Sequence, residues 1–100
     1  MARSRLGPQD ITAKLSELSG WSVNADGTAI SRRFVFRDFS EAFGFMTRVA
    51  LAAEALDHHP DWSNVFRTVE ISLSTHDARG LTELDFTLAV KIDAIAGQVN

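Results

Sequence analysis

Two adjacent histidines, His58 and His59, lie in the segment LDHHPDW, and the chain has only one other histidine, His76. Imidazole can donate or accept a proton near neutral pH, so clustered histidines are candidates for acid–base catalysis. Glu54 lies four residues before His58, a spacing at which two side chains of one helix can meet. A carboxylate there could orient the imidazole and raise its basicity. The segment therefore predicts an acid–base site, and the fold has to bring His76 to it.

Other interpretations of these residues stay open. His58 could merely complement the negative C-terminal end of a helix, which is worth about 0.3–1 kcal/mol. Three histidines, or two with Glu54, could bind zinc, but the spacing matches no standard ligand signature and adjacent histidines do not easily converge on one ion. Trp62 is either a core anchor after a turn or an aromatic wall for a flat heterocycle.

The composition limits the possible functions. The chain has 100 residues, 45% of them hydrophobic and 23% charged, which predicts a single domain over residues 1–100. Its net charge of −3, with acids and bases interspersed, gives no phosphate-binding field, so direct nucleic-acid binding is not expected. The lack of cysteine excludes disulfides, thiolate metal sites and cysteine nucleophiles.

The sequence contains no predicted membrane span and no predicted secretory signal. The apolar runs are too short for a membrane-spanning helix, and the opening MARSRLGPQD lacks the apolar core of a secretory signal. We therefore expect a cytoplasmic protein whose residues 1–8 are frayed.

The first half of the chain predicts a helix followed by a hairpin. Apolar residues at helical spacing follow Pro8 and predict a short helix ended by Gly20; they are Ile11, Leu15 and Leu18. WSV and AISRRFVF flank NADGT, and the Asp26–Gly27 pair suits a tight hairpin turn. One face of the second strand collects Ile30, Phe34 and Phe36.

A long helix is expected over EAFGFMTRVALAAEAL, residues 41–56, with Asp38 or Ser40 as its N-cap. With Asp38 as the cap, Glu41 completes a capping box, and Pro60 sets the helix end near Asp57 or His58. The expected inward stripe consists of Phe43, Met46, Ala50, Ala53 and Leu56. More apolar residues lie outside it, namely Phe45, Val49, Leu51 and Ala52, so we expect a second burial partner, another subunit.

The last third predicts a strand and a helix. VFRTVEISLS, residues 65–74, alternates apolar and polar side chains as one strand buried on one face, and His76 would continue its polar row. Thr82 and Asp85 resemble a capping box that opens a helix to Gly97, with an apolar face of Leu84, Leu88, Ile92 and Ile95. The fold class expected is α+β, a four-stranded antiparallel sheet with three helices packed on one face.

The segment EALDHHPDWSNVFRTVEISLSTHDARGLTELDFTLA resembles the pterin-4a-carbinolamine dehydratases, also known as dimerisation cofactors of a homeodomain transcription factor. The family pattern is an acidic residue, His-His-Pro, an aromatic residue, a later histidine and a final-helix aspartate. This chain supplies Glu54, His58, His59, Pro60, Phe66, His76 and Asp85 at those places. The likeness extends weakly back to about Trp21. Phe66 replaces the usual tyrosine or tryptophan, and Leu84 replaces a basic residue of some relatives, so substrate range or affinity can differ.

This resemblance implies dehydration of 4a-hydroxytetrahydrobiopterin to quinonoid dihydropterin and water, in the recycling of tetrahydrobiopterin after aromatic amino acid hydroxylation. It implies no metal and no further cofactor. It assigns His58 and His76 to acid–base work and His59 to substrate placement with a share in catalysis. Glu54 would orient His58 or the pterin. The other substrate-binding residues that it implies are Asp57, Trp62, Ser74, Thr75 and Asp77.

The resemblance also implies a homodimer formed through the sheet edge or a homotetramer formed through helices, and a functional link to phenylalanine hydroxylase. Relatives of this fold serve as transcriptional co-regulators or as assembly chaperones of a carbon-fixing enzyme. A non-catalytic protein-binding module is therefore the alternative function. Relatives that have left catalysis tend to lose the histidine set, and this chain retains it, which favours the enzyme.

Overall fold

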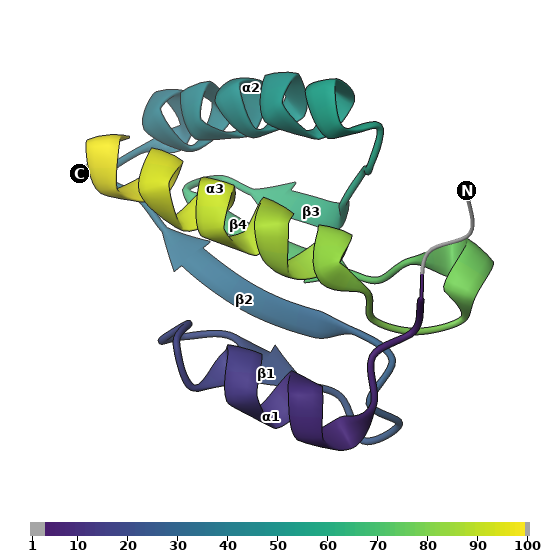
Figure 1. Ribbon diagram of the computed structural model, residues 1–100. Helices are drawn as coiled ribbons and strands as arrows, with labels where there is room; N and C mark the ends of the chain where they lie inside the picture. Colours follow the sequence, from purple (N-terminus) through teal and green to yellow (C-terminus); the bar gives the residue numbers. More distant parts are fainter. Residues whose placement is uncertain (1–3, 100) are drawn as a thin grey trace.

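Four antiparallel strands form one sheet in the order β1-β2-β4-β3 in the computed structural model, which describes residues 4–99. The elements follow one another as α1 (Pro8–Leu15), β1 (Ser22–Val23), β2 (Ile30–Val35), α2 (Phe39–Leu56), β3 (Asp61–Val65), β4 (Thr68–Leu73), the short 3₁₀ turn η1 (His76–Ala78) and α3 (Glu83–Val99). Helices α2 and α3 lie side by side over one face of the sheet (Figure 1). The expected α+β class, with three helices and a four-stranded antiparallel sheet, is confirmed.

The strand expected over residues 65–74 is present but shorter, since β4 covers Thr68–Leu73, and the prediction missed that this strand forms a hairpin with β3. β3 ends at Val65, and β4 begins at Thr68 and pairs with it in the register Val65↔Thr68. Phe66 makes the turn with a left-handed φ of 53°, a conformation normally signalled by Gly, Asn or Asp. The alternation hides this turn because both strands keep a period of two on either side of it.

Helix α2 begins at the cap predicted for it, but its core-facing side overlaps the predicted stripe only at Ala53 and the partly buried Met46 and Leu56. Asp38 accepts the backbone N–H of Glu41 at 2.8 Å, while Glu41 accepts the N–H of Arg37. Its buried residues are Ala42, Phe45, Val49 and Ala53, whereas Phe43 of the predicted stripe is 56% exposed. Phe45 enters an aromatic cluster, with ring centroids 5.0 Å from Phe34 and 4.7 Å from Phe36. A helix that is apolar around most of its circumference does not specify its phase, and here Phe45 rather than Phe43 fills the core.

The core lies between the sheet and the helices. The helix-facing row of β4, Val69, Ile71 and Leu73, is fully buried against residues of α2 and α3. Ile11 of α1 and Leu18 belong to the same cluster, and Ile30, Phe34 and Phe36 of the second strand region are buried as predicted.

The chain ends lie at the edges of this core. Of the segment expected to be frayed, residues 1–3 lie outside the described part, Leu6 donates its N–H to Leu81 O at 2.8 Å, and Pro8 begins α1. At the other end α3 passes beyond Gly97 to Val99. Within residues 4–99 no helix has the length and apolarity needed to cross a membrane.

Candidate active site

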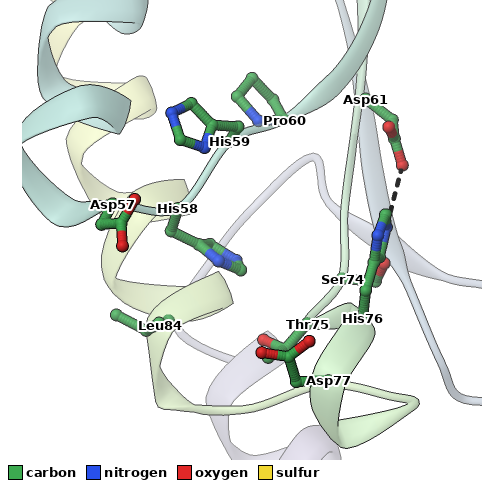
Figure 2. A pocket seen from close by; sticks show the side chains of 10 residues that line it. All are labelled: Asp57, His58, His59, Pro60, Asp61, Ser74, Thr75, His76, Asp77 and Leu84. Atoms are coloured by element: carbon green, nitrogen blue, oxygen red, sulfur yellow. Dashed lines mark ion pairs between the residues drawn. The ribbon is translucent and has the colours of Figure 1, made fainter.

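A hollow of about 520 Å³ opens where α2 ends, β3 begins and β4 leads through η1 toward α3 (Figure 2). It contains all three histidines, so the fold brings His76 to the His58–His59 corner. The complete lining is Asp57, His58, His59, Pro60, Asp61, Ser74, Thr75, His76, Asp77 and Leu84. This volume is within the roughly 300–1,000 Å³ typical of small-molecule sites.

A tight turn at the end of α2 sends the two adjacent histidines in different directions. Asp57 caps the helix in the left-handed conformation, with φ 52°, and the backbone N–H of His58 returns to Ala53 O at 3.0 Å. His58 is buried, with 8% of its surface exposed, while His59 stays on the rim. In Figure 2 the ring of His58 points into the hollow and His59 lies above it beside Pro60.

The partner of His58 is Asp85, on the first turn of α3 and 27 residues away in sequence. His58 Nε2 lies 2.6 Å from Asp85 Oδ1, and Asp85 is completely buried. An ionised carboxylate only accepts hydrogen bonds, so Nε2 carries the proton of this contact. In the neutral ring the lone pair is then on Nδ1.

The other ring nitrogen of His58, Nδ1, is not completely enclosed by protein atoms. Among residues 4–99 the only side-chain hydrogen bond of His58 is the one through Nε2. No buried side-chain nitrogen or oxygen in that part of the chain lacks a partner, so Nδ1 is not fully enclosed. The ring therefore has one nitrogen fixed by a carboxylate and one available for proton exchange.

Asp85 also helps to start the helix on which it lies. Its Oδ2 accepts the backbone N–H of Thr82 at 2.9 Å, and Thr82 Oγ1 accepts the N–H of Leu84 at 3.3 Å. The predicted capping pair is thus present, and the same carboxylate reaches His58 with its second oxygen. Sequence analysis placed Asp85 in the helix cap and in the family pattern but not among the site residues. Its place in both patterns was the signal by which Asp85 could have been selected as a site residue.

The two remaining histidines also face carboxylates, but on the exposed rim. His59 Nε2 lies 2.8 Å from Glu54 Oε1, with 59% and 80% of these side chains exposed. The predicted Glu54–His58 contact is therefore wrong, because the helix ends at Leu56 and the left-handed Asp57 turns His58 inward. His76 Nε2 lies 3.6 Å from Asp61 Oδ2, beyond hydrogen-bond distance, and sequence analysis did not select Asp61.

The remaining predicted residues divide between the hollow and its surroundings. Asp57, Ser74 and Asp77 line it, and so does Thr75, whose hydroxyl is already bonded to Asp85 at 2.8 Å. Trp62 lies outside this lining. It pairs in register with Ile71, packs against the core and borders a separate hollow on the sheet.

The site offers proton chemistry between two imidazoles. Within residues 4–99 no group of three or more His, Asp or Glu side chains is arranged to hold a metal ion. His58 approaches the hollow from the α2 end and His76 from η1, on opposite sides in Figure 2. A flat substrate between them would have a proton acceptor and a proton donor on its two sides.

Sequence comparison relates this chain to a known protein family. The family described as pterin 4 alpha carbinolamine dehydratase matches residues 4–95. A protein of Mesorhizobium japonicum named "Putative pterin-4-alpha-carbinolamine dehydratase" is 60% identical over 97 residues, which cover 97% of this chain and 99% of that protein. A protein of the same name from a Chelativorans species is 58% identical over 98% of this chain and all of its own length.

Two solved structures resemble this chain. The crystal structure of a transcriptional coactivator/pterin dehydratase from Brucella melitensis superposes with a TM-score of 0.91 at 48% identity, covering 94% of this chain and all of the other. A pterin dehydratase-like protein identified as a RuBisCO assembly factor in the alpha-carboxysome gives a TM-score of 0.68 at 23% identity, over 78% of this chain and 90% of the other. The second likeness shows a shared fold alone.

Proposed function

The chain belongs to the pterin 4 alpha carbinolamine dehydratase family, and from that premise we propose that it removes water from a 4a-hydroxytetrahydropterin. The C4a–oxygen bond breaks and the hydroxyl leaves as water with one added proton. The proton on the neighbouring ring nitrogen, N5, is lost, and a C4a–N5 double bond forms. The products are quinonoid dihydropterin and water, and the reaction needs one proton donor and one proton acceptor.

We assign the acceptor role to His58. Its Nε2–H is bonded to the Asp85 carboxylate at 2.6 Å, which leaves the lone pair on Nδ1 at the hollow. When Nδ1 takes the N5 proton, the ring becomes an imidazolium that the adjacent carboxylate stabilises. Asp85 touches no substrate in this scheme and acts through His58.

His76 then protonates the departing hydroxyl from the opposite wall. It is 77% exposed, so solvent can return its proton after each turnover. His59, held by Glu54 at 2.8 Å, positions the pterin at the rim together with Asp57, Ser74 and Asp77. A pterin-dependent aromatic amino acid hydroxylase, such as phenylalanine hydroxylase, supplies the substrate.

The buried His58–Asp85 pair, opening on a hollow shared with His76, is the observation that supports this function best. The test generates 4a-hydroxytetrahydropterin in situ with a hydroxylase and follows its ultraviolet decay with and without the protein, in the presence of EDTA. We expect an acceleration of about 100- to 10,000-fold that survives the chelator. Folded protein that gives no acceleration contradicts the proposal, and an acceleration abolished by EDTA points to a metal-dependent reaction.

We further propose that the chain forms homo-oligomers through the outer face of α2. Phe39 and Phe43 are 49% and 56% exposed with ring centroids 5.8 Å apart, and Leu51 is 69% exposed. Light scattering on the wild type and on Phe43→Ser tests this, because a polar residue in an apolar interface lowers the oligomer mass. A monomeric wild type contradicts it.

The same exposed α2 face favours a second candidate function, a protein-binding module, since proteins seldom leave such side chains uncovered without a partner. A partner-binding role predicts a heterologous protein retained in stoichiometric amount by immobilised wild type and lost with Phe43→Ser. It also predicts that His58→Ala leaves this binding unchanged.

A further inference from the structure

Behind the site, two buried threonine hydroxyls form a chain that ends on Asp85. Thr75 Oγ1 lies 2.8 Å from Asp85 Oδ2, and Thr82 Oγ1 lies 2.7 Å from Thr75 Oγ1. Thr82 is 1% exposed and Thr75 is 6% exposed, so bulk water has almost no access to these two hydroxyls. The chain joins three elements, because Thr75 lies between β4 and η1 and Thr82 precedes α3.

The number of protons fixes the direction of every bond in this chain. The Asp85 carboxylate accepts only, so Thr75 must donate its single hydroxyl proton to Oδ2. Thr75 oxygen can then only accept, so Thr82 must donate its own proton to Thr75. Thr82 oxygen in turn accepts the N–H of Leu84. Neither of these two threonine hydroxyls has a proton left to donate to a substrate.

The same count explains why Asp85 meets His58 through one oxygen alone. Oδ2 receives two donors, the Thr75 hydroxyl at 2.8 Å and the Thr82 N–H at 2.9 Å. Within the described part of the chain, Oδ1 receives only His58 Nε2. The carboxylate is therefore held in one orientation and presents a pure acceptor to the ring.

We propose that Thr82 is a positioning residue that, by orienting the Thr75 hydroxyl, locks Asp85 and keeps the neutral ring of His58 protonated on Nε2. The inference rests on the proposed function for its effect on turnover, but its effect on the ring stands without it. The family likeness implies that Thr75 binds substrate. Here we assign Thr75, together with Thr82, to the positioning of Asp85. The loop that carries it is braced separately, since Thr75 N donates to Gly80 O at 2.9 Å.

The first readout is the proton on the ring and needs no activity. Long-range ¹H–¹⁵N correlation spectra of histidine-labelled protein, at a pH where the rings are neutral, distinguish the two tautomers. We expect wild-type His58 to be almost entirely the Nε2–H form. Thr82→Val keeps the shape and the backbone donor to Asp85 but removes the donor that holds the Thr75 oxygen. The Thr75 hydroxyl can then rotate away from Oδ2 and the carboxylate can turn from His58 Nε2, so the Nδ1–H share should rise severalfold. Thr82→Ser should restore the wild-type spectrum.

The second readout separates positioning from binding. Thr82→Val should lower kcat roughly five- to tenfold with KM changed by less than about twofold, and Thr82→Ser should recover kcat to within about twofold. Thr87→Val, an exposed threonine on the same helix, is the matched control and should leave both readouts unchanged.

Each outcome decides for or against the proposal. An Nδ1–H tautomer in the wild type overturns it, and that measurement requires no variant to fold. A Thr82→Val protein that loses turnover with its tautomer unchanged also overturns it, since the loss is then structural. If the tautomer responds as expected but the wild type shows no dehydration, the proposed function fails and the positioning role of Thr82 stands.

Discussion

The three histidine–carboxylate contacts found among residues 4–99 fall into a buried one and two exposed ones. His58 and Asp85 have side-chain exposures of 9% and 0% and are 2.6 Å apart, and Asp85 accepts two further hydrogen bonds. His59 with Glu54, and His76 with Asp61, are more than half exposed. Of these three pairs, only the buried one has a carboxylate that further hydrogen bonds, from the Thr75 hydroxyl and the Thr82 N–H, hold in place.

This difference shows that a shared pair of residue types does not imply a shared role. Exposed charged pairs lose most of their interaction to solvent and contribute about 0–1 kcal/mol. A buried carboxylate has no water to replace a lost partner, so its contacts are costly to remove. We therefore expect changes at the inner pair to alter chemistry and stability, and changes at the carboxylates of the outer pairs to alter little.

The largest expected effect comes from removing an imidazole. His58→Ala and His76→Ala should each lower turnover by about 100- to 10,000-fold, the usual contribution of a general acid or base. His59→Ala should mainly raise KM. Steady-state decay of in situ generated carbinolamine measures all three, with circular dichroism as the check on folding. Near wild-type turnover in both His58→Ala and His76→Ala would remove the mechanism.

The next effect concerns stability and compares two aspartates. Asp85→Ala leaves His58 Nε2, the Thr75 hydroxyl and the Thr82 N–H without their acceptor and removes half of the α3 cap. The free energy of unfolding should fall by about 3 kcal/mol. Asp61→Ala, at the exposed pair, should change it by less than about 0.5 kcal/mol. Urea denaturation compares them, and equal losses would contradict the contrast between the pairs.

A smaller effect is expected where Glu54 holds His59 at the rim. Glu54→Gln should raise KM about two- to threefold in dilute buffer, because an exposed contact contributes little. The difference from wild type should vanish near 1 M salt, where the Debye length is about 3 Å. Michaelis constants at two salt concentrations test this, and a difference that persists in high salt would mean a direct contact between Glu54 and the substrate.

The smallest effect is expected at Asp61. It lies 3.6 Å from His76, too far for a hydrogen bond, and both side chains are exposed. Asp61→Asn should change kcat and KM by less than about twofold. A tenfold fall in kcat would show that the pair closes when substrate binds and that the outer contacts are not equivalent.

Local signals in the sequence predicted much of the fold. The capping residues Asp38 and Glu41, the hairpin before them and the helix start at Thr82 each depend on residues a few positions apart. The turn at Phe66 was missed because a bulky residue adopts the left-handed conformation there. The phase of α2 was predicted only in part because its apolar residues surround the helix, and the aromatic cluster is what selects Phe45 over Phe43.

The site, too, was predicted where its residues are close in sequence and missed where a contact joins distant residues. The proximity of His58 and His59 is a property of the sequence, and the family pattern connected them to His76. The contact of His58 with Asp85 spans 27 residues, and the left-handed turn at Asp57 cancels the local contact with Glu54. The catalytic roles of the three histidines stay predictions until turnover is measured.

The most direct test of the account is the turnover of Asp85→Asn measured beside Glu54→Gln. An amide at residue 85 can still accept the Thr75 and Thr82 donors on its oxygen, but its NH₂ group then faces His58 Nε2 and favours the wrong tautomer. We predict a fall in kcat of at least about 100-fold for Asp85→Asn with the fold retained, and no more than about threefold for Glu54→Gln. Equal turnover in the two variants would contradict the claim that the buried pair drives the reaction.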